Sequence, residues 1–320
     1  MNSDSRFGGP MGIILSLSLM AGACAKQVQT LNYLDPQAPS IYKAKQEAED
    51  RAPLKSTGKE VKRGAKSYEA QGDQAMALGK MEEALSAYRQ ALSLNQDQGL
   101  IHEKMGRILL YRNEPDQAIA HFEQALKTDP PSARAMEGLG SAHLRKGQYE
   151  KAEEALKKAL ERDSGLPAAH NGLGVLHDRR GEHDRAVGFY QLALLLDPEN
   201  ASYHNNLGYS RLLSGDVDGA IASLKEAVRL DPGFKKAHNN LGYAYGLKGD
   251  DLRAFEEFRK ATDEAGAYNN LGYLYYKMGR YPQAVDSFKR AIESRPVWYV
   301  KAAENREAVA GWMEGGENKR

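Results

Sequence analysis

The 320-residue sequence has one cysteine, Cys24, and almost no net charge, with 44 basic against 43 acidic residues. A single cysteine excludes an intrachain disulfide. The charge balance gives no support for a nucleic-acid-binding surface, so we predict no nucleic-acid partner. Tryptophan and phenylalanine are scarce, at 2 and 7 residues, whereas tyrosine occurs 17 times. Tyrosine suits a hydrated binding surface as well as a core.

The apolar run near the N-terminus is short. It spans Met11–Met20, follows Arg6, and is succeeded by the small residues at 21–23 and then by Cys24. Such a run cannot cross a bilayer but has the layout of a secretory signal with a small-residue cleavage site. Its end resembles the lipobox of bacterial lipoproteins, in which the cysteine is acylated and becomes the new N-terminus. The resemblance implies a signal segment at 1–24 and a lipid anchor on Cys24; secretion without lipidation is the alternative.

Self-similarity is what the sequence has in abundance. The motif His204-Asn-Asn-Leu-Gly-Tyr209 returns at 238–243 and, with tyrosine first, at 268–273. Glycine recurs with a step of 34 residues, then 30, at Gly72, Gly106, Gly140, Gly174, Gly208, Gly242 and Gly272. Between these glycines and a recurring alanine stands a breaker, which is glycine in each unit except for Asn113. Asparagine also tolerates the left-handed conformation that ends a helix.

Each unit is therefore predicted to be a helix, a tight turn and a second helix, with small residues where the two backbones approach. This pattern resembles the tetratricopeptide family over 65–298, in seven units. The resemblance implies an all-α, right-handed superhelical solenoid. Prolines at 36, 39 and 53 and a poor apolar period predict a flexible tether at 25–64, and 299–320 is predicted to form a capping helix and a tail. The 30-residue step predicts a shortened second helix or a tight turn near Glu264–Ala267.

Polar residues of the first helices form the candidate site. If each unit is numbered so that its recurring glycine is position 8, positions 2, 5, 6, 9 and 13 share one side of the first helix, which the resemblance places on the concave side. In units one to three this side is charged, whereas in units five to seven it is rich in amides and phenols. Rows of amides can pair with the backbone of an extended peptide, although bracing of adjacent helices is the alternative. The predicted peptide groove consists of Asn171, Asn205, Asn206, Tyr209, Asn239, Asn240, Tyr243, Asn269, Asn270, Tyr273, Arg179 and Lys277.

Catalytic and metal-binding motifs are missing from the sequence. We find no phosphate-binding loop and no nucleophile arrangement, and Gly172-Leu-Gly174 falls inside an expected helix rather than after a strand. Four histidines occupy position 4 of successive or nearby units, where a packing role is favoured over metal binding: His102, His170, His204 and His238. We predict no enzymatic activity, no metal and no cofactor.

Within the repeat family, the stretches 205–216 and 239–250, together with the shortened step that leads to 269–271, resemble the TadD lipoproteins of Tad (Flp) pilus assembly. That resemblance implies a lipid-anchored scaffold in the bacterial cell envelope, at the outer membrane and facing the periplasm, that serves a pilus or secretion machine. A pilotin-like carrier of a secretin and a periplasmic adaptor for proteases or cell-wall enzymes are the alternatives. The sequence leaves the oligomeric state open.

Overall fold

The computed structural model describes residues 58–95, 98–128, 130–294 and 302–309, and these are helical or in short connections, with no strand among them. Cys24, the signal segment 1–24 and most of the predicted tether lie outside the described residues. None of the described helices is long and apolar enough to cross a membrane.

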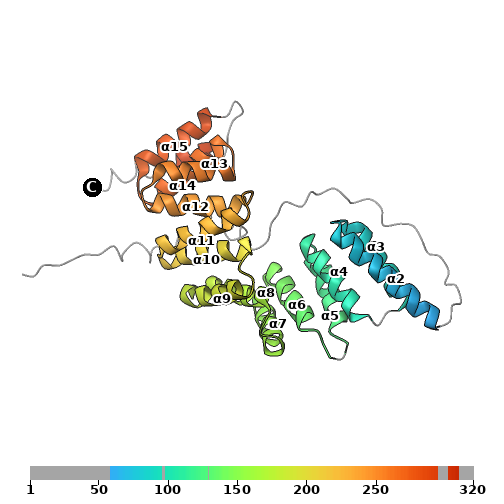
Figure 1. The fold of residues 1–320 in the computed structure, drawn as a ribbon. Coiled ribbons are helices and arrows are strands. Elements are labelled where there is room, and N and C mark those ends of the chain that lie inside the picture. The colour runs from blue at the N-terminus through green and yellow to red at the C-terminus, as the bar shows by residue number, and fades with distance from the viewer. Residues whose placement is uncertain (1–57, 96–97, 129, 295–301, 310–320) are drawn as a thin grey trace, which may run out of the picture. The chain divides into compact units, whose positions relative to one another are not determined.

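Fourteen labelled helices form seven helix-turn-helix pairs, which follow one another along the chain (Figure 1). In order they are α2 (Gly58–Ala77), α3 (Met81–Leu94), α4 (Gly99–Tyr111), α5 (Pro115–Ala125), α6 (Ala133–Arg145), α7 (Tyr149–Arg162), α8 (Pro167–Arg179), α9 (His183–Leu196), α10 (Ala201–Ser214), α11 (Val217–Leu230), α12 (Lys235–Leu247), α13 (Asp251–Ala261), α14 (Glu264–Lys277) and α15 (Tyr281–Glu293). The predicted all-α solenoid of seven repeats is confirmed. The first helix begins at Gly58, earlier than the predicted array, because 58–64 holds helix-forming residues without a regular apolar period.

Helix pairs close at the predicted breakers. The glycine of each turn has a positive φ, for example 88° at Gly215, and Asn113 takes the same conformation with φ 61°. The left-handed role predicted for Asn113 is therefore confirmed. The predicted shortening of the second helix is also confirmed, because α13 has 11 residues. α14 starts two residues after the C-cap Thr262, and the Asp263 side chain accepts a hydrogen bond from the Gly266 amide at 2.7 Å.

The core of each pair depends on the recurring glycine. A Cβ at Gly208 would lie 2.6 Å from Leu224 Cγ, and one at Gly242 would lie 2.7 Å from Phe258 Cδ1. Leu224 and Phe258, which fill this space from the second helices, are 0% and 1% exposed. Burial of each such side chain contributes about 1.5–3 kcal/mol to folding. A side chain at the glycine would separate the two helices and lose this contribution.

The last pair is covered by a helical segment at 302–309. Val309 joins the apolar cluster built from α11 to α15, and Ala302 and Ala303 are buried. A repeat array buries each apolar face only against its neighbours, so a terminal unit needs such a cover. This segment stands where an eighth first helix would begin.

Candidate functional site

The first helices of the pairs (α2, α4 and the even-numbered helices up to α14) adjoin one another. Consecutive members from α4 to α14 are in contact, in addition to their contacts with the second helices. We call the side on which they adjoin the first-helix face. It carries positions 5, 6 and 9 of each unit, so the predicted groove residues at these positions lie on it.

Asparagine side chains on this face bond from one repeat to the next. Asn206 donates to Asn171 at 2.9 Å, Asn240 to Asn205 at 2.9 Å, Asn270 to Asn239 at 2.8 Å and Asn305 to Asn269 at 3.0 Å. Asn205 also donates to its neighbour Asn206 at 3.3 Å. We call these eight residues the amide ladder. It links α8, α10, α12, α14 and the helical segment at 302–309.

Burial decides what the ladder can do. Asn205, Asn206 and Asn269 are 1%, 8% and 6% exposed, so their amides lie between helices rather than in an open groove. The bracing alternative therefore describes these three residues, which were predicted to face a ligand. Asn171, Asn239, Asn240 and Asn270 are half-buried and keep an edge at the surface. Asn305 was not predicted, although it follows Asn269 and Asn270 at about one repeat length.

The tyrosines of the same face are more accessible than the three buried amides. Tyr209, Tyr243 and Tyr273 are half-buried, and Lys277 is exposed with its Nζ 5.6 Å from the centre of the Tyr273 ring. Burial, aided by the nearby Tyr273, raises the pKa of Tyr243. Arg179, the remaining predicted groove residue, is exposed and lies with its guanidinium 4.5 Å from the centre of the Tyr149 ring.

A lysine that the prediction did not include belongs to this region. Lys236 occupies position 2 of unit six, one turn before Asn240, and burial lowers its pKa to about 8. Two open depressions in the described structure lie elsewhere. One, of about 380 Å³, is lined by α11, α12 and α13, and the other, of about 520 Å³, by α14 and α15; neither contains a predicted groove residue.

In the N-terminal units the first-helix face is charged, as predicted, and its charges pair with one another. Lys104 donates to Glu69 at 2.9 Å and to Asp73 at 2.8 Å, across the boundary between units one and two. Glu69 and Lys104 stand at positions 5 and 6, so this ion pair is the charged counterpart of an amide-ladder bond. Arg107 lies 3.3 Å from Glu103 and 4.0 Å from Glu137 in the next unit.

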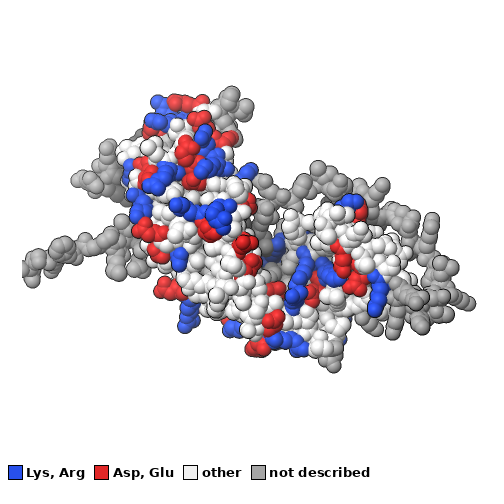
Figure 2. Space-filling model, viewed as in Figure 1, with Lys and Arg blue, Asp and Glu red and all other residues white. Residues whose placement is uncertain are grey.

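A second series of ion pairs ties the turns to the preceding unit. Lys248 contacts Asp218 at 2.6 Å and Arg112 contacts Glu82 at 2.5 Å, and Lys146 with Asp116 is equivalent. Each such exposed pair is worth roughly 0–1 kcal/mol. On the face shown in Figure 2, basic and acidic side chains alternate rather than gather by sign.

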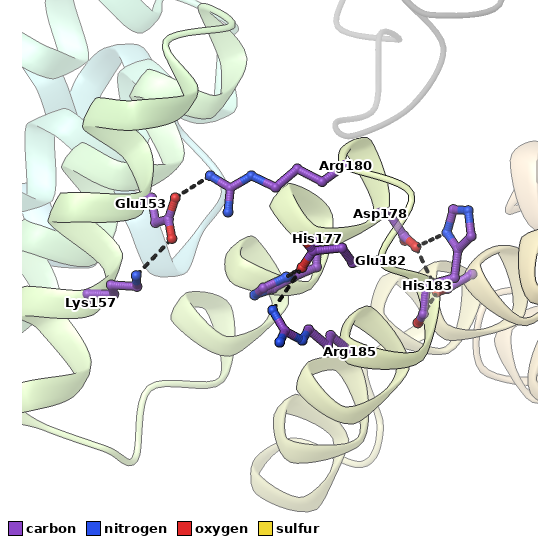
Figure 3. Close-up of polar contacts among 9 residues, drawn as sticks. Glu153, Lys157, His177, Asp178, Arg180, Glu182, His183 and Arg185 are labelled. Carbon is purple, nitrogen blue, oxygen red and sulfur yellow. Dashed lines mark hydrogen bonds and ion pairs between the residues drawn. The ribbon is translucent and has the colours of Figure 1, made fainter. Parts of the chain in front are cut away.

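The turn of unit four holds the most connected polar cluster (Figure 3). Asp178, whose side chain is 2% exposed, accepts from Tyr190 at 2.8 Å, from Ser210 at 2.7 Å and from His183 at 2.9 Å. The carboxylate thereby joins α8, α9 and α10. At the equivalent position the neighbouring units have Leu144 and Leu212. The sequence therefore shows that Asp178 differs from its counterparts, but we predicted no role for it.

The outer part of this cluster reaches back to unit three. Glu153 of α7 accepts from Arg180 and lies 2.8 Å from Lys157. These donors, Arg180 first, lower the pKa of Glu153 to about 2. On the other side of the turn, His177 is 2.7 Å from Glu182, which Arg185 contacts at 3.2 Å. Because each of these groups has a polar partner, the cluster serves as a structural joint between repeats.

Three of the four position-4 histidines share a structural role. The imidazole Nε2–H of His170, His204 and His238 donates to the backbone carbonyl six residues earlier, at 3.0, 2.9 and 3.0 Å. His102 instead lies 2.9 Å from His121, and burial lowers the pKa of His121 to about 4. Across the described ranges, no group of three or more histidine, cysteine, aspartate or glutamate side chains could hold a metal ion.

Comparison with known proteins agrees with this architecture. The family model described as cilia and flagella-associated protein 70 C-terminal domain matches residues 17–266, and the tetratricopeptide repeat model matches 265–296, which is the seventh unit. No curated protein matches the chain.

Among solved structures, a tetratricopeptide repeat protein from Parabacteroides merdae is 15% identical, with 78% of this chain and 99% of that chain covered and a TM-score of 0.52. The anaphase-promoting-complex hetero-tetramer Cut9–Hcn1 is 19% identical over 70% of this chain and 45% of that chain, also with a TM-score of 0.52. A MamA structure is 25% identical over 53% of this chain and 93% of that one, with a TM-score of 0.42.

The fold and the interlocked first helices define a helical repeat scaffold. More particularly, because the first family model spans more than half of the chain, the protein belongs to the tetratricopeptide-repeat family that this model describes.

Proposed function

We propose that the protein is a non-catalytic scaffold that holds an extended segment of another protein against the first-helix face of units five to seven. The observation that carries this proposal is the row formed by Tyr209, Tyr243 and Tyr273. These phenols are half-buried and recur once per repeat, at position 9 of units five, six and seven. Tyrosine gives rigid, amphipathic contact area at low entropic cost.

The amides take a different part in this proposal from the one predicted. The buried members of the amide ladder hold the first helices at a fixed separation, which fixes the spacing of the tyrosines. The half-buried Asn239, Asn240 and Asn270 keep an edge through which a peptide backbone can bond. Lys277 adds a cation at one end of the row, which favours an acidic group or a carboxylate in the bound segment.

The contrast between the two halves of the array supports this location. In units one and two the first-helix charges are engaged with one another, through Lys104, Glu69 and Asp73. A ligand there would have to break ion pairs that already satisfy each group. At positions 5, 6 and 9, units five to seven have neutral asparagine and tyrosine side chains, so a ligand that contacts these positions breaks no ion pair between the repeats.

Substitution of the three tyrosines tests the proposal. Tyr209→Ser, Tyr243→Ser and Tyr273→Ser place at position 9 the residue that unit three has there, Ser141. We expect the triple variant to lose partner proteins that the parent captures from its native cell envelope after crosslinking. Leu252→Glu, at a side chain that is 84% exposed on α13, is the matched control and should capture normally. Equal capture by the triple variant and the parent would refute the proposal, provided that circular dichroism shows both folded.

The place of action is a separate part of the proposal. The apolar run at 11–20 and the cysteine that follows support a lipid anchor on Cys24 and a position at the outer membrane facing the periplasm. Cys24→Ser is expected to move the protein from the membrane to the soluble fraction of the cell envelope. Unchanged membrane association of this variant would remove the lipid anchor from the account.

The likeness of 205–216 and 239–250 to the TadD lipoproteins supports a role in assembly of a pilus or secretion machine. Co-purification of pilus-assembly proteins is the result expected from this role. Recovery of a secretin tail alone would instead identify a pilotin-like carrier, and recovery of proteases or cell-wall enzymes would identify an adaptor.

A further inference from the structure

The depression between α11 and α13 has a cationic rim and apolar inner walls. Its volume is about 380 Å³. Lys225 and Arg229 of α11 and Lys260 of α13 line it, and all three side chains are exposed. Leu241 and Tyr245 of α12 also line it and are only 2% and 8% exposed, so they form its inner part. Sites for small ligands have this composition, with apolar walls and a few convergent polar groups.

The rim charges are only partly balanced by carboxylates. Arg229 contacts Glu226, three residues earlier on α11, at 2.6 Å, and Lys260 contacts Glu257 on α13 at 2.7 Å. Lys225 has no ion pair with any residue that the structure describes. Both ion pairs lie within one helix and contain an exposed cation, and such pairs are weak enough for the cation to be shared with a bound anion.

Glu257, the carboxylate among the lining residues, is also engaged by a histidine. Its Oε2 lies 2.6 Å from His238 Nδ1, and His238 Nε2–H donates to the Pro232 carbonyl at 3.0 Å. Because both ring nitrogens face oxygen atoms, one proton lies between Nδ1 and the carboxylate, and the pair of His238 and Glu257 carries no net charge. Lys225 and Lys260 therefore contribute two positive charges that no carboxylate of the depression cancels.

The equivalent positions hold no other set of three cations along the array. Lys225 and Arg229 stand at positions 25 and 29 of unit five, and Lys260 stands at position 26 of unit six. From the first boundary between units onward, the other five sets are Arg89, Ser93 and Gln124; Glu123, Lys127 and Lys158; Lys157, Glu161 and Leu192; Gln191, Leu195 and Glu226; and Arg259, Asp263 and Arg290. Four of these sets include a carboxylate, so the fold does not require a cation at each position. The basic set between units five and six therefore calls for a separate explanation.

We propose that this depression binds a phosphate group that is carried on an apolar body. A phosphate monoester has about 1.5–2 negative charges near pH 7, which matches the two uncancelled lysine charges. Its three terminal oxygens can accept from Lys225, Arg229 and Lys260 at once, whereas a carboxylate has one charge and two oxygens. The carbon part of the ester can contact the buried side chains of Leu241 and Tyr245. Soluble phosphate esters and phosphatidic acid share this chemistry.

Isothermal titration calorimetry of the full chain with phenyl phosphate and with inorganic phosphate tests this site. We expect one saturable site, which binds phenyl phosphate at least threefold more tightly because the phenyl ring contacts the apolar walls. Equal or weaker binding of phenyl phosphate would overturn the proposed contact with an apolar body. No saturable binding of either compound, together with no preference for phosphatidic acid in vesicle flotation, would overturn the site itself.

Paired lysine substitutions locate the site. Lys225→Gln with Lys260→Gln should weaken phosphate binding at least tenfold. The matched control, Lys157→Gln with Lys158→Gln, removes the same charge from positions 25 and 26 of unit three and should bind like the parent. An equal loss in both variants would show attraction by net charge alone and would overturn the proposal, as would normal binding by the first variant. Circular dichroism should show that both variants keep the helicity of the parent.

Vesicle flotation distinguishes the two sources of the phosphate group. The full chain is mixed with vesicles of phosphatidylcholine, with or without phosphatidic acid. A preference for phosphatidic acid that is lost with Lys225→Gln and Lys260→Gln, but kept in the control, identifies a lipid head group. Binding of phenyl phosphate without this preference identifies a soluble phosphate ester. A preference for phosphatidic acid that both lysine variants keep would contradict binding in this depression.

Discussion

The amide ladder makes a quantitative prediction about folding stability. Asn205 is 1% exposed, and its Oδ1 accepts from Asn240 at 2.9 Å while its Nδ2 donates to Asn206 at 3.3 Å. Asn240→Ala would leave one buried acceptor without its partner, and Asn205→Ala would leave a donor and an acceptor unpaired. A buried polar group that loses its partner costs about 1–3 kcal/mol. We therefore expect a loss of about 1–2 kcal/mol for Asn240→Ala and about 2 kcal/mol for Asn205→Ala.

The double variant separates the hydrogen bond from the other effects of each substitution. Because both partners of the 2.9 Å bond are absent in it, the double variant should cost less than the sum of the two single variants, by about 1 kcal/mol. Free energies of unfolding come from urea titrations followed by circular dichroism. Hydrogen exchange of α10 and α12 adds a local measurement, since a repeat array opens unit by unit.

Gln191→Ala, which removes an exposed amide from α9, is the control and should change stability by less than about 0.5 kcal/mol. The bracing role is refuted if Asn205→Ala and Asn240→Ala behave like this control and their effects simply add. In that case the asparagines would be free for a ligand, and the division of roles between amides and tyrosines would be wrong.

Three further predictions concern the joints between repeats. Asp178→Ala should cost about 3 kcal/mol by urea titration, because buried donors lose their acceptor; a loss below about 1 kcal/mol would contradict the joint. Glu153 has its pKa lowered to about 2 from an ordinary 4.5, so its contribution is present above about pH 4.5 and is lost as pH falls toward 2. The melting temperature of Glu153→Gln should therefore lie below that of the parent at pH 7 and meet it near pH 2; a gap that does not change with pH would count against this assignment. Lys236→Met should stabilise the protein by about 1 kcal/mol at pH 7, and this advantage should fade between about pH 8 and pH 10.5, since burial disfavours only the charged lysine; no gain at pH 7 would contradict this assignment.

Much of the fold could be predicted because the residues that determine each helix pair lie within a single repeat. A left-handed turn residue, a small residue where helices cross and an apolar stripe are properties of single helices, and their sevenfold recurrence removes ambiguity. Asn113 illustrates this: its position among six glycines was enough to predict a positive φ. The short step before Asp263 was readable from spacing for the same reason.

The orientation of the amides could not be predicted in this way. The helical period places positions 5 and 6 on one side of the first helix. The distance to the adjacent first helix, however, decides whether the Asn205 side chain contacts solvent or bonds with Asn240. That distance depends on packing between repeats, which no period within one repeat encodes. The bond from Asn305 to Asn269 was missed because 302–309 lacks the recurring glycine that identifies a first helix.

In the proposed function, a partner chain lies along the tyrosine row of units five to seven. The most direct measurement is site-specific photocrosslinking in the native cells, with benzoylphenylalanine in place of Tyr243 or, as the control, in place of the exposed Leu252. We expect a covalent adduct with a discrete partner from position 243 and none with that partner from position 252. The same adduct from both positions, or from position 252 alone, would contradict it.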